Sequence, residues 1–406
     1  MCDCDSSPPL PSSTEVCIVG AGPSGLACAL GLAARKIPFV IVDAVAEGHT
    51  ASRAIVIYPG ALESIGALDP QVAEDIMATG TKYPFGMFMA QHTVEEAMRA
   101  GIHRSGSGIH FGKRMEAIEE VDDGAQYELL FESGERLRAR YIVATDGAKS
   151  SLRSFAGITF RDPYTKKEAA PGAQDSNFIV SDVVFEKPTE SVARDALQLS
   201  LVEDGFLLTG PLKDPVDPGL HLFRLYIGMT GTPPRNADLA YLQGVLDAQF
   251  PGSKTTPRNV PSIAKVLHAA RFRTRPALAD SYLHRTKGGA YILLAGDAAH
   301  THGPGGRQGM NLGICDGASL ALAIDKHRTA SLETKGDARQ ILESYAKTRR
   351  EVGWGVIDTV QDMENLEAGG LSWARWFRIM AVRILSPVPF VNNLMAWQTS
   401  GLGYAA

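Results

Sequence analysis

Six residues near the start of the chain, Gly-Ala-Gly-Pro-Ser-Gly at positions 20–25, restrict how the first domain can fold. They follow a hydrophobic stretch, Val16–Val19, that predicts a buried strand, and they open a predicted helix over Ser24–Arg35. Phe39–Val42 predicts a second buried strand. A strand, a helix and a parallel strand form a βαβ unit, so the sequence predicts an open α/β sheet of the Rossmann type.

Each glycine of this turn has a physical role in binding a dinucleotide. Gly20 permits the tight turn, Gly22 lets a pyrophosphate approach the backbone, and Gly25 allows the helix to pack against the strand. The helix N-terminus adds amide donors and a positive dipole. Asp43, at the end of the second strand, is placed to accept from an adenosine ribose. The motif predicts a dinucleotide site, which FAD, NAD and NADP all fit.

Two further segments place a carboxylate directly after a predicted strand. Asp146 lies in Thr-Asp-Gly-Ala-Lys-Ser at positions 145–150, and Asp297 lies in Gly-Asp-Ala-Ala-His at positions 296–300. Ligands of open α/β sheets bind at the carboxyl ends of the strands. We therefore expect both carboxylates beside the dinucleotide.

The three segments together resemble the FAD-dependent aromatic hydroxylases, the class A flavin monooxygenases that include para-hydroxybenzoate and phenol hydroxylases. The resemblance runs from about Val16 to Tyr404 and rests on the order and separation of the motifs. It implies that the bound dinucleotide is FAD. It also implies a Rossmann-like FAD-binding domain with an inserted antiparallel-sheet substrate domain and C-terminal helices, an α/β fold that is α+β overall.

The resemblance assigns flavin contacts by position. It makes Asp297 the acceptor for the ribityl chain and places Gly309, Met310 and Asn311 beside the pyrimidine edge of the flavin. These three residues open a helix predicted from about Gln308 to His327. A helix N-terminus stabilises the negative charge of a reduced flavin, which agrees with this placement.

Three more residues match cofactor positions of the family. Arg53 corresponds to an arginine near the flavin pyrophosphate, and Gln91 to a glutamine that contacts the flavin. The resemblance also implies that Asp146 contributes to binding both the flavin and the reduced pyridine nucleotide. Because only one Gly-x-Gly-x-x-Gly is present, NADPH or NADH is expected to dock transiently as the reductant.

The activity implied is hydroxylation of a small phenolic or aromatic substrate by dioxygen and NAD(P)H, through a flavin hydroperoxide. Tyr58, His221, Arg224 and Tyr226 are the candidate catalytic residues, although a structural role on a strand or in the core suits each equally well. Phenol hydroxylases carry an aspartate where this chain has Ile55. The acid that activates a phenol is therefore absent or elsewhere.

Alternative functions fit parts of the sequence. The run Asn311–Asp316 and the apolar C-terminus suit a monooxygenase or epoxidase acting on a prenylated, quinone-pathway or isoprenoid substrate. Oxidative decarboxylation of a hydroxybenzoate would use the same flavin chemistry. Trp373–Trp376 does not supply the W-x-W-x-I-P segment of flavin-dependent halogenases. A non-catalytic flavin-binding module is disfavoured because all three motifs are intact.

We expect the domains to interleave along the chain. From about residue 170 the pattern changes to short alternating segments, which are typical of an antiparallel sheet with one solvated face. The predicted divisions are a disordered leader at 1–14, an FAD-binding domain at 15–70, 92–168 and 286–350, a substrate domain at 71–91 and 169–285, and a C-terminal helical segment at 351–406.

Charge and cysteine content limit the partners and the compartment. A net charge of −5 gives no broad cationic surface for nucleic acid. Five cysteines, an odd number in no disulfide pattern, favour a reducing, cytoplasmic location. The uncharged stretches Val16–Ala34 and Ile384–Ala406 are interrupted by glycine or proline, so no transmembrane segment is expected.

Two histidines resemble a metal motif, but the sequence assigns no metal. His300 and His302 have no carboxylate or thiolate spaced to complete a ligand set, and roles at a turn or a pocket edge are preferred. In the family resembled, the antiparallel sheet often supports a homodimer.

Overall fold

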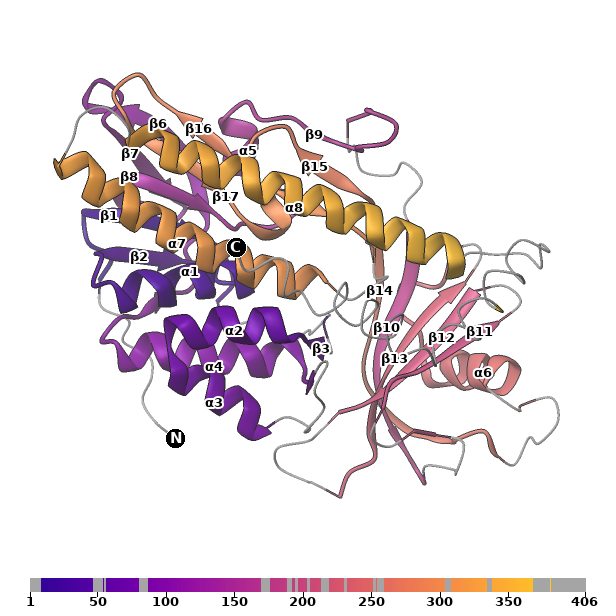
Figure 1. Ribbon diagram of the computed structural model, residues 1–406. Coiled ribbons are helices and arrows are strands. Elements are labelled where there is room, and N and C mark those ends of the chain that lie inside the picture. Colours follow the sequence, from indigo (N-terminus) through magenta and orange to yellow (C-terminus); the bar gives the residue numbers. More distant parts are fainter. Residues whose placement is uncertain are drawn as a thin grey trace.

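The computed structural model describes residues 9–46, 54, 56–79, 87–168, 176–187, 192–193, 196–202, 205–212, 219–229, 232–250, 253, 259–303, 308–333, 338–367 and 380. The chain forms a mixed α/β fold in which helices cover a large, mainly parallel sheet and a separate antiparallel sheet lies to one side (Figure 1).

The large sheet is built around the predicted βαβ unit. Strands β1 and β2 are parallel, with Cys17 opposite Val40, and helix α1 connects them, which confirms the prediction. Strand β8 lies on the other side of β1 and β17 lies beside β8, both parallel. The path of the sheet is β16 (Leu283–Arg285), β17 (Tyr291–Leu294), β8 (Arg136–Ala144), β1 (Ser13–Val19), β2 (Phe39–Val42) and β5 (Ile109–His110), with α1 over Pro23–Ala34.

Short strands extend this sheet and connect its loops. β6 and β7 pair as a hairpin, and β7 pairs antiparallel with the first half of β8. A small three-stranded sheet and a two-stranded ribbon lie outside the main sheet. The strands are β3 (Val56–Ile57), β4 (Met87–Phe88), β6 (Met115–Val121), β7 (Gln126–Phe131), β9 (Phe160–Arg161), β15 (Ala277–Ala279) and β18 (His300–Thr301). Short helices lie in the connections: η1 (Asp122–Gly124), α5 (Ser151–Phe155) and η3 (Gly296–Ala298).

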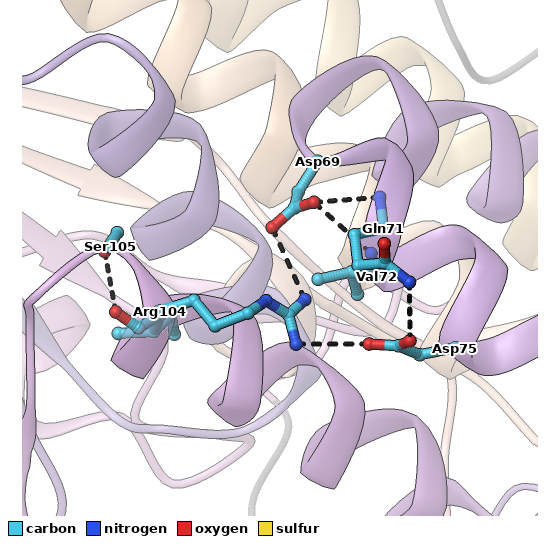
Figure 2. Close-up of polar contacts among 7 residues, drawn as sticks. Asp69, Gln71, Val72, Asp75, Arg104 and Ser105 are labelled. Atoms are coloured by element: carbon cyan, nitrogen blue, oxygen red, sulfur yellow. Dashed lines mark hydrogen bonds and ion pairs between the residues drawn. The ribbon is translucent and has the colours of Figure 1, made fainter.

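Long helices pack beside the sheet. Helix α7 contacts α1, α2 and α8, and α3 contacts both α2 and α4. Figure 2 shows Arg104 of α4 between two carboxylates, with Nη2 3.7 Å from Asp69 and Nη1 3.2 Å from Asp75 of α3. The helices are α2 (Pro59–Leu68), α3 (Pro70–Thr79), α4 (Gln91–Arg104), α7 (Gly309–Glu333) and α8 (Ala338–Glu367).

The second sheet is antiparallel throughout and has two hydrophobic faces. One face packs on helix α6 through residues such as Phe223 and Leu225, and the other packs on β3 through Phe178 and Tyr226. Its order is β11 (Gln198–Val202), β12 (Gly205–Pro211), β13 (Leu222–Met229), β10 (Ser176–Phe185) and β14 (Ile263–Thr274), with α6 over Leu239–Gln249.

The packing differs from the predicted divisions at three places. Ser13 and Thr14 pair with β8 and so belong to the sheet rather than to a leader. We placed α3, β15 and β16 in the substrate domain. Helix α3 contributes Val72 and Ile76 to the core of the large sheet, β15 contributes Ala279, and β16 pairs with β17. The alternating pattern identified strands but not the core on which each one packs. Beyond Glu367, the C-terminal segment lies outside the described residues except for position 380.

Among the helices that the structure describes, none combines the length and apolar character needed to cross a membrane.

Glycines on α7 let it approach α1 closely, which generates a prediction. A Cβ at Gly317 would lie 2.1 Å from the backbone oxygen of Ser24. Gly317→Ala should therefore push α1 and α7 apart and lower the free energy of unfolding by about 1–3 kcal/mol, measured by chemical denaturation. The control Gly355→Ala, where a Cβ would meet no atom within 4 Å, should be neutral or raise it by about 0.5–1 kcal/mol. Equal effects of both variants would contradict the prediction.

Candidate functional site

The glycine-rich turn has the geometry of a cradle for a phosphate group. Gly20 has φ +109°, and a Cβ there would lie 2.2 Å from the backbone oxygen of Thr145. A Cβ at Gly25 would lie 2.0 Å from the oxygen of Gly20, so both glycines are required by the protein itself. A Cβ at Gly22 would meet no protein atom within 4 Å. Gly22 therefore faces open space at the start of α1, as a bound pyrophosphate requires.

Asp43 is held at the mouth of this turn. Its Oδ2 accepts a hydrogen bond from the amide of Ala21 at 2.7 Å, and its Oδ1 accepts from the amide of Val45 at 3.0 Å. These bonds fix the carboxylate at the end of β2, beside the turn. Each carboxylate oxygen has a second lone pair, so Asp43 can also accept from ribose hydroxyls.

The second cofactor segment is brought to the same edge by glycines. A Cβ at Gly296 would lie 2.1 Å from the Ser24 hydroxyl oxygen, and one at Gly313 would lie 2.3 Å from it. The turn after β17 and the start of α7 therefore lie directly against the start of α1. Asp297 follows Gly296 with an exposed side chain at the carboxyl end of β17. The predicted residues Gly22, Asp43 and Asp297 thus share one edge of the sheet.

The Asp146 segment supports the site structurally. Oδ2 of Asp146 accepts from the amide of Ser151 at 2.9 Å and so holds the start of α5. Arg153 of that helix donates to the carbonyl of Ala148 at 2.9 Å and to that of Ala298 at 2.8 Å. Arg153 therefore joins the Asp146 and Asp297 loops, a role that the sequence did not reveal.

The start of α7 combines two functions. The bond from Leu312 N to Gln308 O belongs to the first turn of this helix, so the amides of Gly309 and Met310 precede it and can donate to an anion. The buried Asn311 side chain instead accepts from Tyr58 N at 2.7 Å and donates to Val56 O at 3.0 Å. Asn311 therefore fixes β3 beside the helix start.

Gln91 and Arg224 converge on Ala54. The side-chain oxygen of Gln91 accepts from the backbone amide of Ala54 at 3.4 Å, and the backbone amide of Gln91 donates to the Ala54 carbonyl at 3.2 Å. Arg224, fully buried, donates to that carbonyl at 2.8 Å and binds both oxygens of Asp182 at 2.6 and 2.7 Å. The bidentate ion pair joins neighbouring strands of the second sheet, and the bond from Arg224 to Ala54 attaches this sheet to the segment before β3. The predicted phosphate ligand Arg53 lies outside the described residues.

Tyr58 and Tyr226 share a hydrophobic face between the β3 segment and the second sheet. Both side chains are buried, and they pack in one cluster with Val56, Phe178, Val180 and Leu208. The Arg224 side chain also hydrogen-bonds to Tyr226. Of the four candidate catalytic residues, the structure brings Tyr58, Arg224 and Tyr226 together.

His221 is placed away from these three. Its carbonyl accepts from the amide of Phe185 at 2.9 Å, which continues the pairing of β10 with β13. Phe185 packs in the core on the α6 face. Because side chains alternate along a strand, His221 falls on the phase of Phe223 rather than that of Arg224. His221 is therefore not among the candidates that the structure brings together, and a catalytic role for it stays a prediction.

A buried ionic cluster behind the site was missed by the sequence analysis. Asp316 of α7 accepts from His300 Nε2 at 2.6 Å, from Gly296 N at 3.0 Å and from Arg349 Nε at 2.7 Å. Asp316, His300 and Arg349 are at most 1% exposed. The sequence offered one indication of this cluster: Asp316 is the only charged residue in the stretch 312–324. Its partner Arg349 could not be inferred, because it lies on another helix.

Electrostatics keep Asp316 ionised. Burial alone would raise its pKa, but Arg349, His300 and the Gly296 amide outweigh burial and hold the pKa below its usual value. The cluster ties α7, α8 and the Asp297 loop together by charge-assisted hydrogen bonds. Nε2 of His300 is thereby occupied by Asp316.

A sequence model of the family described as “FAD binding domain” matches residues 13–85, 69–190 and 260–360 of this chain. These ranges contain the glycine-rich turn, Asp43, the Asp146 loop, the Asp297 loop and the start of α7. The family match and the geometry thus identify the same edge of the large sheet.

Two curated proteins are similar over most of this chain. One is 6-methylpretetramide 4-monooxygenase of Streptomyces rimosus, 25% identical over 395 residues, which are 89% of this chain and 63% of that protein. The other is rifampicin monooxygenase of Rhodococcus hoagii, 26% identical over 393 residues, which are 87% of this chain and 71% of that protein. The chain therefore spans less than two thirds of the first relative.

Solved structures share the fold. A p-nitrophenol 4-monooxygenase from Pseudomonas putida has a TM-score of 0.72 and 22% identity, with 97% of this chain and 99% of that chain covered. A Diels-Alderase of the pyrroindomycin pathway has a TM-score of 0.74 and 19% identity, with 98% and 81% covered. Since these two proteins are named for different reactions, the fold alone does not decide the chemistry.

The ionic cluster generates a prediction about stability. Asp316→Asn leaves Arg349 buried without its counter-charge and should lower the free energy of unfolding by about 3–5 kcal/mol at pH 7. Asp325→Asn on the same helix removes a partly exposed pair with Arg35 and should cost at most about 1 kcal/mol. Chemical denaturation of both variants measures the difference.

The pH dependence has a definite sign. Because the folded pKa of Asp316 is depressed, its contribution is present above the unfolded pKa of about 4 and is lost as the pH falls through the folded pKa. The stability gap between the wild-type protein and Asp316→Asn should therefore shrink below about pH 4. A gap that stays constant down to pH 3 would contradict this assignment.

Proposed function

Because the chain belongs to the FAD binding domain family, we propose that it is an FAD-dependent monooxygenase that hydroxylates a phenolic or similarly electron-rich aromatic compound with NADPH or NADH and dioxygen. The observation that carries the proposal is the convergence of Gly22, Asp43, Asp297 and the start of α7 on one edge of the sheet, next to the hydrophobic face around Tyr58.

The residues present along this edge fit FAD. The turn at 20–25 and the start of α1 would hold the pyrophosphate, Asp43 the adenosine ribose and Asp297 the ribityl chain. The amides of Gly309 and Met310 would donate to the pyrimidine edge of the flavin. Bound FAD supplies the redox chemistry that links oxidation of the nicotinamide to activation of dioxygen.

The hydrophobic face would hold the substrate. Phe178 stacks on Phe272 with ring centroids 5.8 Å apart, and Val180 and Leu208 complete an apolar surface that suits a flat aromatic ring. The hydroxyls of Tyr58 and Tyr226 are the groups there that could hydrogen-bond to a phenol. Substrates named for the curated relatives, 6-methylpretetramide and rifampicin, are larger than one phenol ring, so multi-ring phenols belong in the same class.

The protein's own residues would position this surface and keep it dry. The Arg224–Asp182 pair fixes Ala54, and Asn311 fixes the backbone at Val56 and Tyr58. The segment carrying Tyr58 is thereby held against both the helix start and the second sheet. Exclusion of water by these buried contacts strengthens polar interactions with a bound phenol.

A substrate panel tests the proposed reaction. The FAD-loaded protein should oxidise NADPH or NADH faster with one group among simple phenols, 4-hydroxybenzoates, multi-ring phenols and prenylated phenols. Product mass should increase by one oxygen. With a hydroxybenzoate, loss of the carboxyl carbon would identify oxidative decarboxylation. Bound FAD with no acceleration by any compound would overturn the proposal of an aromatic hydroxylase.

Retention of FAD tests the cofactor assignment separately. Asp297→Ala removes the exposed carboxylate proposed to accept from the ribityl chain, and the purified variant should hold less FAD per chain than the wild-type protein, measured from its visible absorption. Loss of one charge-assisted hydrogen bond corresponds to roughly a tenfold weaker affinity. Asp358→Ala, an exposed carboxylate on α8, is the control and should retain FAD fully. Wild-type retention by Asp297→Ala would remove Asp297 from the site.

A further inference from the structure

His302 has one ring nitrogen committed to the protein. It follows β18, and its Nδ1 lies 2.7 Å from the carbonyl oxygen of Gly303. A carbonyl oxygen can only accept, so Nδ1 carries the hydrogen of this bond. In the neutral ring, Nε2 is then an acceptor with a lone pair.

The second nitrogen faces the start of α7. Nε2 is buried and has no hydrogen-bond partner among the residues that the structure describes. The position of a Cβ at Gly309 would be 3.8 Å from both Nε2 and Cε1. Nε2 therefore lies against the backbone of Gly309, at the helix start where the flavin ring is proposed to lie.

The surroundings favour the neutral ring. Burial lowers the pKa of His302, and nearby His300 lowers it further, while the Gly303 carbonyl and Asp297 act in the opposite direction with a smaller effect. A neutral imidazole at pH 7 offers an acceptor at Nε2 rather than a charge. The neighbouring His300, in contrast, has its Nε2 satisfied by Asp316.

An unpaired buried acceptor has a cost that a ligand can remove. Leaving a buried polar atom without a partner is unfavourable, and such atoms are uncommon in folded proteins. Nε2 of His302 is an atom of this kind that lies beside the proposed cofactor position. The complementary ligand group must be a donor.

We propose that Nε2 of His302 accepts a hydrogen bond from an N–H or O–H group of the ligand bound at the start of α7. The proposal rests on the site of the proposed function and adds a specific contact to it. Two ligand groups have the required chemistry: the imide N–H of the flavin pyrimidine ring and the hydroxyl of a phenolic substrate. In the second case, His302 would supply an acceptor in a chain that has Ile55 where phenol hydroxylases have an aspartate.

Two substitutions separate the acceptor from the rest of the side chain. His302→Leu removes both ring nitrogens, while His302→Gln places an amide oxygen near the position of Nε2. Thermal unfolding of both full-length variants shows that they are folded. Each is then titrated with FAD in the absence of substrate, followed by flavin fluorescence, and the FAD-loaded form is titrated with 4-nitrophenol, whose ionisation is visible in its absorption spectrum.

The two sources of the donor give different results. If the donor is the flavin imide, His302→Leu should raise the dissociation constant of FAD roughly tenfold and change the flavin absorption, while His302→Gln stays within about threefold of wild type. If the donor is the phenol, FAD affinity is unchanged. The dissociation constant of 4-nitrophenol then rises by a similar factor in His302→Leu and is restored in His302→Gln.

Two results would overturn the proposal. Wild-type behaviour of His302→Leu in both titrations would show that Nε2 receives no ligand donor. Equal losses in the Leu and Gln variants would show that shape, not the acceptor, matters. Failure of the proposed function gives a different result. If FAD affinity depends on His302 but no phenol accelerates NADPH oxidation, the His302 contact is supported and the assignment as a monooxygenase is wrong.

Discussion

The close contact between α1 and α7 brings three cofactor segments together: the glycine-rich turn, the Asp297 loop and the start of α7. Glycines at 296, 313 and 317 let the turn after β17 and the start of α7 lie against Ser24. A side chain at any of these positions would meet Ser24 within 2.3 Å. Because Ser24 is itself part of the glycine-rich turn, this packing brings two segments separated by more than 270 residues to one edge of the sheet. The dinucleotide cradle is therefore a product of helix packing as much as of local turn geometry.

The sequence predicted the parts of the fold that depend on local patterns. The βαβ unit, the return strand β17 and the strands β10 to β13 follow from apolar runs and alternation that neighbouring residues define. The positions of Gly22 and Asp43 follow from the same local pattern. The boundaries of the domains did not follow, because Val72 of α3 and Ala279 of β15 are equally apolar whichever core they join.

The contacts that shape the site could not be predicted from spacing. Asn311 bonds to the backbone of Tyr58 across 253 positions, and Arg153 reaches Ala298 across 145. Arg224, a candidate for catalysis by its polarity, is used by Asp182 and Ala54 instead. A polar residue on a strand shows that a partner is needed but not which one, so sequence alone left the structural and catalytic interpretations of Arg224 equal.

A comparison of the buried polar groups shows where the site still offers an interaction. Asp316, His300 and Arg349 bind one another, and Arg224 and Asp182 form a bidentate pair, so these groups serve the protein. In the part of the chain that the structure describes, the His302 ring is hydrogen-bonded through Nδ1, and its buried Nε2 has no partner. Burying an acceptor away from water is unfavourable unless it forms a hydrogen bond. A bound ligand can provide that bond. The donor for Nε2 of His302 is therefore expected from the bound ligand, and its chemistry is limited to an N–H or O–H group.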